Sequence, residues 1–377
     1  MNSGVDVTTS IKNMITNIDE NFAGIIMTFM ILCIVLLSIW YYLYMTGLST
    51  KECKIMTKMY GTLDTYIKSL NPSDPNCQYN LEDYYIKSAY NCCSGGTYKN
   101  DYVNICNLKN VLKQGVRALD FEIYSINNEP VVATSTVTSN YIKETYNYVL
   151  FSDVMTIISN YAFANSTVPN PDDPIIFHLR IKSTNQAMYT ALANIFKAND
   201  SLFLGPKYSY ENNGQNLGLL PLLNLNGKII VIVDKLNDSF MDNTHFYEYV
   251  NMTSNSIFMR ALHYYDVKNT PDINELIQYN KSSMTITMPD IGANPPNPSG
   301  IVCRETGAQM ISMRYQQNDV NLEENIAFFD SGGYAFVLKP ANLRYIQATI
   351  PIPPPQNPAV SYAPRKTTAS GGHVLSV

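Results

Sequence analysis

The sequence contains little charge and no excess of positive charge. Charged residues make up 15% of its 377 residues, and the formal net charge is -5. Proteins that bind nucleic acid present a basic face to the phosphate backbone, so we expect no nucleic-acid partner. Hydrophobic residues reach 46%, which is ample material for a large core, and tyrosine is plentiful, with 28 residues.

Several motifs of catalysis and metal binding are also absent. The chain has no GxSxG turn, no P-loop and no GxGxxG turn. Its seven cysteines show no CxxC or Cys/His spacing that would indicate a zinc site. Cys33 lies in an apolar run. For the other six, disulfides within the region from Cys77 to Cys106 and reduced, buried thiols are both open.

A stretch without any charged residue covers residues 21–50. Its apolar part, 25–44, has the ~20 residues that a helix needs to cross a bilayer. Trp40 and three tyrosines lie at its C-terminal end, as in an interfacial aromatic belt. A signal peptide would have a basic leader and a small-residue cleavage site, whereas this leader is acidic. The sequence predicts a short N-terminal segment, 1–22, and one transmembrane helix over 23–48.

The side of the membrane is indicated by two opposing signals. Lys51, Lys54 and Lys58 follow the apolar run, whereas Lys12 alone precedes it. The positive-inside rule then places the large C-terminal part on the cytoplasmic side, and this is the location we expect for a single-pass membrane protein. Disulfides would favour an oxidising compartment instead.

Strand-like and helix-like runs alternate between residues 84 and 345. Such alternation over this length favours a parallel α/β fold, specifically a (β/α)8 barrel of the TIM type. Residues 49–83 are expected as a stalk, and 346–377 as a Pro-rich, disordered tail. The predicted strands are 86–92, 116–124, 130–136, 174–182, 228–234, 284–289, 308–315 and 334–339. The predicted helices are 107–114, 146–163, 185–198 and 272–280.

Two acidic residues mark the most informative strand. Asp120 and Glu122 are two residues apart in the run 116–124, so the alternation of side chains along a strand puts both carboxylates on one face. Two neighbouring carboxylates without a local base favour a hard cation such as calcium.

The motifs of the domain resemble a known family. In order along the chain they are LKQGVRALDFE (112–122), EPVVATSTVTS (129–139), PIIFHLRIKS (174–183), LNGKIIV (225–231), GAQMISMRYQ (307–316) and GGYAFVLKPANLR (332–344). Together they resemble the catalytic barrel of phosphoinositide-specific phospholipase C, in both its X and its Y halves. The resemblance implies a calcium-assisted attack of the inositol 2-hydroxyl on its own phosphodiester, with two histidines as acid and base. It also implies that Asn91, Asp120 and Glu122 match polar positions of the family's active site.

Other positions depart from that pattern. By the resemblance, the two histidines of the family fall at Tyr90 and Thr134, and a third acidic metal ligand falls at Arg180. The lysines that grip substrate phosphates fall at Ile232 and Asp234. Neither Tyr90 nor Thr134 titrates near neutrality as histidine does, so the resemblance implies a degenerate active site.

Arg180 suggests what replaces the metal. A guanidinium between Asp120 and Glu122 would satisfy both carboxylates and repel a cation. We therefore expect no cofactor, with calcium bound by Asp120 and Glu122 as the alternative. His178 has the same strand parity as Arg180, so a new site made by His178 and Glu122 is a further alternative.

These features predict a membrane-anchored pseudoenzyme that acts as a structural scaffold or protein-interaction module. Its general character resembles membrane proteins of large DNA viruses, in which it would link a viral membrane to the capsid. Capsid or other virion proteins would then be its partners and the virion membrane its location. The alternative function is a phosphoric diester hydrolase, or a phospholipid head-group binder, with an altered active site.

Overall fold

The computed structural model describes residues 4–137, 141–346 and 363–376 of the chain. The chain divides into two compact units, Met1–Tyr345 and Ile346–Val377. The second unit contains an antiparallel hairpin of β12 (Lys366–Thr368) and β13 (Val374–Ser376). The Pro-rich part of the expected tail, 347–362, lies outside the described residues.

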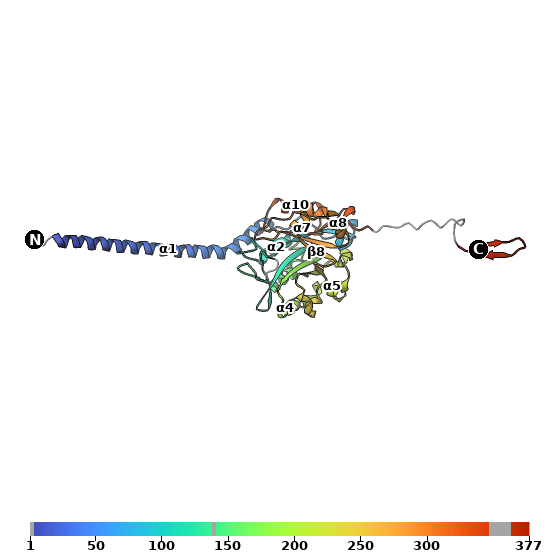
Figure 1. Ribbon diagram of the computed structural model, residues 1–377, viewed down its shortest axis with the longest axis horizontal. Helices are drawn as coiled ribbons and strands as arrows, with labels where there is room; N and C mark the ends of the chain where they lie inside the picture. Colours follow the sequence, from blue (N-terminus) through green and yellow to red (C-terminus); the bar gives the residue numbers. More distant parts are fainter. Residues whose placement is uncertain (1–3, 138–140, 347–362, 377) are drawn as a thin grey trace. The chain divides into compact units, whose positions relative to one another are not determined.

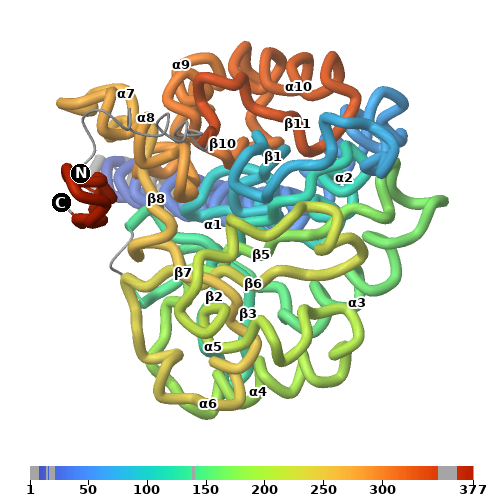
Figure 2. The backbone as a smooth tube through the Cα atoms, turned by 90° about the vertical axis from the view of Figure 1, so that its right-hand side faces the viewer, coloured from blue at the N-terminus to red at the C-terminus, as the bar shows by residue number. Residues whose placement is uncertain are grey.

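Eight parallel strands form a nearly closed barrel, which confirms the expected α/β fold (Figure 2). Their order in the sheet is β7-β6-β5-β2-β1-β10-β9-β8, so β7 and β8 are the two ends of the hydrogen-bonded path. The strands are β1 (Tyr84–Ala89), β2 (Ala118–Ile126), β5 (Ile175–Lys182), β6 (Ile229–Asp234), β7 (Met252–Ser254), β8 (Met259–His263), β9 (Met284–Met288) and β10 (Met310–Met313).

Helices surround this barrel. Each of the longer ones buries an apolar face against the strands; α4, for example, buries Met188, Leu192 and Phe196, which are spaced four residues apart. The helices are α2 (Ile105–Lys113), α3 (Phe151–Tyr161), α4 (Gln186–Lys197), α5 (Ser209–Gly214), α6 (Thr244–Tyr247), α7 (Tyr264–Lys268), α8 (Ile273–Ser282), α9 (Gly300–Glu305) and α10 (Val320–Gly332).

Two of the predicted strands are not barrel strands. The run 130–136 gives β3 (Glu129–Val132), which returns antiparallel to β2 after a turn at Asn127 and Asn128, both with positive φ. The run 334–339 gives β11 (Phe336–Leu338), which pairs antiparallel with β1. The barrel positions belong instead to β7 and β8, which are too short to show a clear periodicity.

The interior of the barrel has an apolar end and a polar end. At the amino ends of the strands, inward-facing Ala118, Ile176 and Ile230 are fully buried in one apolar cluster. Outward-facing residues of the same strands pack under the helices; the Phe121 ring lies 6.1 Å from that of Phe151 and 5.7 Å from that of Phe177. Burial of side chains of this size contributes about 1.5–3 kcal/mol each. Polar residues occupy the barrel interior at the carboxyl ends of the strands.

A single long helix, α1 (Gly4–Tyr60), precedes the barrel (Figure 1). From Phe22 onward it is long and apolar enough to cross a membrane, as the sequence predicts. Its C-terminal turns become part of the globular domain, because Met56 and Tyr60 are buried in the core beside α2. The segment expected as a stalk then continues along the barrel and buries Ile67.

Of the two alternatives left open for the cysteines from Cys77 to Cys106, the structure has no disulfide within this region and has buried thiols instead. Cys106, on α2, pairs with Cys53 on α1, while Cys77, Cys92 and Cys93 are buried free thiols. The sequence offers no sign of this pairing because it depends on α1 lying alongside α2.

Candidate functional site

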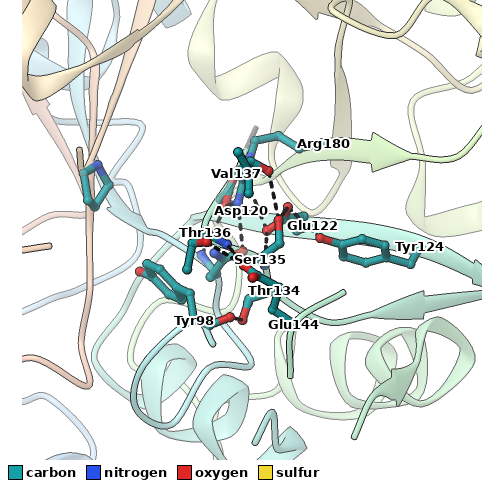
Figure 3. A network of polar contacts seen from close by, with 12 residues as sticks. Tyr98, Asp120, Glu122, Tyr124, Thr134, Ser135, Thr136, Val137, Glu144 and Arg180 are labelled. Carbon is teal, nitrogen blue, oxygen red and sulfur yellow. Dashed lines mark hydrogen bonds and ion pairs between the residues drawn. The ribbon is translucent and has the colours of Figure 1, made fainter. Parts of the chain in front are cut away.

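The polar cluster at the carboxyl end of the barrel is built by two adjacent strands. In the parallel ladder of β2 and β5, Asp120 is opposite His178, and Glu122 is opposite Arg180. All four side chains have the inward parity and are buried. Figure 3 shows Asp120, Glu122 and Arg180 converging at this point.

Arg180 makes a direct, two-point ion pair with Asp120. Its Nε lies 3.0 Å from Oδ2 of Asp120, and a terminal guanidinium nitrogen lies 2.9 Å from Oδ1. The same nitrogen donates to Oδ1 of Asn91 at 2.8 Å. The other terminal nitrogen lies 3.6 Å from Oε2 of Glu122. The guanidinium thus occupies the space between the two carboxylates, and its hydrogen bonds go to Asp120.

The residues after β1 close the cluster from a third side. The Tyr90 ring lies against the guanidinium, with 4.5 Å between its centroid and the Arg180 Cζ, a cation–π geometry. Asn91 has a positive φ of 46°, and its backbone N–H donates to Oδ1 of Asp120 at 3.1 Å. Tyr90 and Asn91 therefore stabilise the same Asp120–Arg180 pair.

Glu122 is held by a separate set of donors. The Tyr124 hydroxyl lies 2.9 Å from its Oε1, and the Ser135 hydroxyl lies 3.1 Å from the same atom. The neighbouring Thr134 donates to the backbone carbonyl of Tyr98 at 3.0 Å. Thr134 is therefore engaged in a structural hydrogen bond beside the cluster (Figure 3).

His178 has two partners inside the barrel. Its Nδ1 lies 2.7 Å from Oδ2 of Asp120, and its Nε2 lies 2.9 Å from the Ser254 hydroxyl. The ring is fully buried. The alternative site of His178 with Glu122 is not formed, since both ring nitrogens are engaged elsewhere.

The electrostatics of the cluster favour its charged form. Burial alone would raise the pKa of Asp120, but the positive charge of Arg180 and the hydrogen bond from His178 hold that pKa well below its usual range. Burial alone would lower the pKa of Arg180, but the negative charge of Asp120 raises it well above the usual value. Both groups remain ionised across the physiological range.

Calcium, which the resemblance implies, does not fit these residues. A calcium ion takes six to eight oxygen ligands, whereas both oxygens of Asp120 and Oδ1 of Asn91 already accept hydrogen bonds from Arg180. Within the described parts of the chain, no three His, Cys, Asp or Glu side chains are grouped so that they could hold a metal ion. The guanidinium would also repel a divalent cation.

The space above the cluster is nearly filled. The cavity lined by Tyr90, Glu122 and Arg180 has a volume of about 10 Å³, which is room for about one water molecule. A larger pocket of about 330 Å³ lies next to it, lined by Tyr141, Arg180 and Lys182 together with Asp234. The second pocket therefore has room for a molecule larger than water, whereas the first does not.

The structure brings together all seven residues that the sequence singles out: Tyr90, Asn91, Asp120, Glu122, Thr134, His178 and Arg180. Sequence reasoning missed three of their partners, Tyr124, Ser135 and Ser254. Tyr124 has the strand parity of Asp120 and Glu122 and could have been found by the same alternation. Ser254 carried no such signal, because its strand, β7, was not predicted.

Comparison with known proteins identifies the class of domain. Residues 77–235 match the family model of the phosphatidylinositol-specific phospholipase C, X domain. The solved structures of PLC21 from S. officinalis and from L. pealei are similar, each at 18% identity with a TM-score of 0.58. The matched parts cover 73% and 72% of this chain. They cover 39% and 38% of the two PLC21 chains, so this chain spans well under half of their length. The domain of this protein is therefore a phospholipase C-like barrel.

A smaller solved structure is matched over most of its own length. The calcium-dependent phosphoinositol-specific phospholipase C of Pseudomonas sp is 12% identical, with a TM-score of 0.43, and 97% of that chain is covered by 70% of this one. Among curated proteins, the sequence has no match.

Proposed function

We propose that this protein is a membrane-anchored pseudoenzyme, whose phospholipase C-like barrel is a structural scaffold or protein-interaction module. The observation that carries the proposal is the Arg180 guanidinium, which is bonded to both oxygens of Asp120 and lies 3.6 Å from Glu122. A permanent cation occupies the place in which the resemblance puts a calcium ligand. Tyr90 and Thr134, at the positions of the family's histidines, are both buried and cannot exchange protons near pH 7.

Two features of the barrel support the scaffold role. Its core is large and its polar cluster is internally paired, so the domain is a stable body that needs no cofactor. The apolar length of α1 anchors this body to a membrane. Its partners would be neighbouring proteins at that membrane, including capsid or other virion proteins if the membrane belongs to a virus.

An enzymatic assay tests the loss of catalysis. The full chain in phosphatidylinositol-containing vesicles with calcium should release no inositol phosphate. The matched control is the Glu122→Gln variant, which removes the one acid that does not pair bidentately with Arg180. Turnover by the wild type that disappears in this variant would overturn the proposal and establish the hydrolase alternative.

Cross-linking with mass spectrometry in the native membrane tests the scaffold role. Cross-links of fixed stoichiometry between the barrel and abundant membrane or coat proteins are expected. A barrel that cross-links to no abundant neighbour contradicts a scaffold.

A head-group binder is the second candidate, and the 330 Å³ pocket favours it. Arg180, Lys182 and Asp234 all line this pocket, so it presents both signs of charge to a zwitterionic or phosphate-bearing group. Burial and the neighbouring Arg180 lower the pKa of Lys182. Binding of inositol phosphate that is lost in Lys182→Met would support this candidate.

The side of the membrane is part of the proposal. The three lysines after the apolar run support a cytoplasmic position of the barrel, whereas the Cys53–Cys106 disulfide is typical of oxidising compartments. Protease protection of the barrel in sealed native vesicles tests this placement: cleavage from the cytoplasmic side supports it, and protection contradicts it.

A further inference from the structure

The part of α1 that precedes the membrane span, residues 4–21, is a helix that its own composition favours only weakly. It contains no Ala and no Leu, and it is rich in Val, Ile, Thr and Asn, which have lower helix propensities. In proteins, most of the stability of a helix comes from packing of an apolar face against a partner. A partner for residues 4–21 would therefore supply the stability that their composition lacks.

The apolar residues of this part repeat with the spacing of a coiled coil. Val7, Ile11, Met14 and Ile18 are separated by four, three and four positions, which makes them the d, a, d and a positions of consecutive heptads. These four residues are called the seam below. Both a positions hold isoleucine, a β-branched residue that is common there in paired helices. Ile11 is 52% exposed, so the described parts of its own chain do not cover it.

The charged residues of the same part avoid the seam. Asp6 and Glu20 fall at c positions of the heptad, and Lys12 and Asp19 fall at b positions. The e and g positions, which flank the seam, hold only uncharged residues: Thr8, Ser10, Ile15 and Asn17. In a coiled coil the e and g residues of one helix meet those of its partner, so that their charges decide which helices pair. Two identical helices can therefore meet here without repulsion between like charges.

The membrane span decides how two copies would meet. In each copy α1 is one continuous helix, Gly4–Tyr60, and enters the bilayer from the same side. Residues 4–21 of two copies are then parallel and at the same depth, so identical a and d positions face each other, as in a parallel coiled coil. None of the residues in the apolar window of α1 is buried against another described part of the chain. A second helix can therefore approach along this length.

The barrel does not obstruct such a pair. It packs against the side of α1 that carries Met56 and Tyr60, which are buried in the core, and Cys53, which is bonded to Cys106. With 3.6 residues per turn, the seam points roughly a third of a turn away from this side of the helix. In a twofold-symmetric pair, the two barrels then lie on opposite sides of the paired helices and not between them.

We propose that residues 4–21 pair with the same residues of a second copy of this chain, through the seam, as a parallel coiled coil on the membrane side opposite to the barrel. The inference rests on the membrane anchor of the proposed function and goes beyond it, because it makes the scaffold a unit of two barrels. Each barrel is fixed to its own α1 by the Cys53–Cys106 disulfide, so pairing of the helices joins the two barrels.

Disulfide cross-linking of the full chain in its membrane tests the pairing. In a Cys33→Ser background, Ile11→Cys and Met14→Cys each put a thiol in the seam. Thr9→Cys and Thr16→Cys are the matched controls, because both residues are exposed and fall at f positions, opposite to the seam. After mild oxidation, with the remaining thiols blocked, most of each seam variant should run as a dimer without reductant, and most of each control variant as a monomer. Equal dimer fractions in the two sets would overturn the proposal.

The mass of the full chain in detergent, from light scattering on a sizing column, provides a measurement without cysteines. The wild type should have the mass of two chains. The double variant Ile11→Glu/Ile18→Glu should fall to one chain, because it buries like charges in the seam, whereas Thr9→Glu/Thr16→Glu should stay at two.

Two results would overturn the pairing and leave the anchor intact. One is a wild type with the mass of a single chain. The other is cross-linking of Ile11→Cys to a different membrane protein and not to its own copy, since that protein would then cover the seam. Release of the wild type from membranes by alkaline carbonate would instead contradict the anchor of the proposed function.

Discussion

An aspartate is buried near an arginine at both ends of the β2–β5 pair, and the two sites differ in how the charges meet. At the carboxyl end, Asp120 and Arg180 are in direct two-point contact. At the amino end, the guanidinium of Arg117 donates to the carbonyl of Ala162 at 2.9 Å and to Oδ1 of Asn170 at 2.8 Å. Asp173 accepts from Nδ2 of the same Asn170 at 2.9 Å, so an amide separates the two charges.

This difference decides the charge state of each carboxyl group. The pKa of Asp120 is held well below its usual range despite burial. Burial raises the pKa of Asp173 to about 6, and the charge of Arg117 offsets this only in part. The pKa of Arg117 is itself lowered by burial to about 10. In this protein the carboxylate in direct contact with a guanidinium has a lowered pKa, whereas the one separated from it by an amide has a raised pKa.

Breaking the carboxyl-end pair should have the largest effect. Arg180→Glu puts a third carboxylate beside Asp120 and Glu122, so we expect a loss of about 3–5 kcal/mol in the free energy of unfolding. Added calcium should restore part of this loss, because three carboxylates can hold it. Urea denaturation with and without calcium measures both effects.

The matched control for this variant is Arg260→Glu, which breaks the half-exposed pair with Glu275. A surface ion pair contributes about 0–1 kcal/mol. If Arg180→Glu melts at the wild-type temperature with and without calcium, the position assigned to Arg180 is wrong.

The pH dependence of stability should separate the two aspartates. The pKa of Asp173 is raised in the folded state. Its contribution to the free energy of unfolding is therefore present below about pH 4 and is lost as the pH rises to about 6. The shift corresponds to about 3 kcal/mol. Glu82, whose pKa burial raises to about 7, acts in the same direction. Asp120 has the opposite effect. Because its pKa is lowered in the folded state, its contribution to the free energy of unfolding is present above about pH 4 and is lost below it.

Denaturation between pH 4 and pH 7 measures this dependence. Asp173→Asn should flatten the fall in stability over this range, while leaving the part that is due to Glu82. An unchanged slope would contradict the assigned ionisation of Asp173.

Removal of the amino-end arginine should cost less than removal of the carboxyl-end arginine. Arg117→Met leaves Asp173 without its cation, but at pH 5 this carboxyl group can stay protonated, so we expect a loss of about 2 kcal/mol from the unpaired carbonyls. Arg180→Met should cost more, because it removes the donor shared by both oxygens of Asp120 and by Asn91, together with the charge beside Glu122. Equal losses in the two variants at pH 5 would remove the distinction between the two ends.

The smallest effect is expected at the edge of the carboxyl-end cluster. Tyr124→Phe removes one of the two hydroxyl donors to Oε1 of Glu122, and Ser135 retains the other. We expect a loss of about 1 kcal/mol, measured against Tyr265→Phe, an exposed tyrosine that should show no change. A loss as large as that of Arg180→Glu would mean that Glu122 depends on Tyr124 and not on Arg180.

The carboxyl-end cluster was accessible from the sequence, because strand parity puts Asp120 and Glu122 on one face and the family resemblance puts Arg180 beside them. The amino-end pair was not, since Arg117 and Asp173 precede their strands and meet through Asn170. The packing of α1 against α2 was also missed. Its contacts join residues about 50 positions apart in the sequence, and local periodicity does not indicate which distant segments will pack together. Short strands such as β7 were not predicted, because three residues are too few to show an alternation of polar and apolar side chains.

The most direct test of the central claim is calcium binding by the full chain in detergent, measured by isothermal titration calorimetry and by the shift in melting temperature. The account predicts no saturable heat and no shift at millimolar calcium for the wild type, and a positive shift for Arg180→Glu. Micromolar binding by the wild type that is lost in Glu122→Gln would contradict it, because a metal would then displace the Arg180 guanidinium from the two carboxylates.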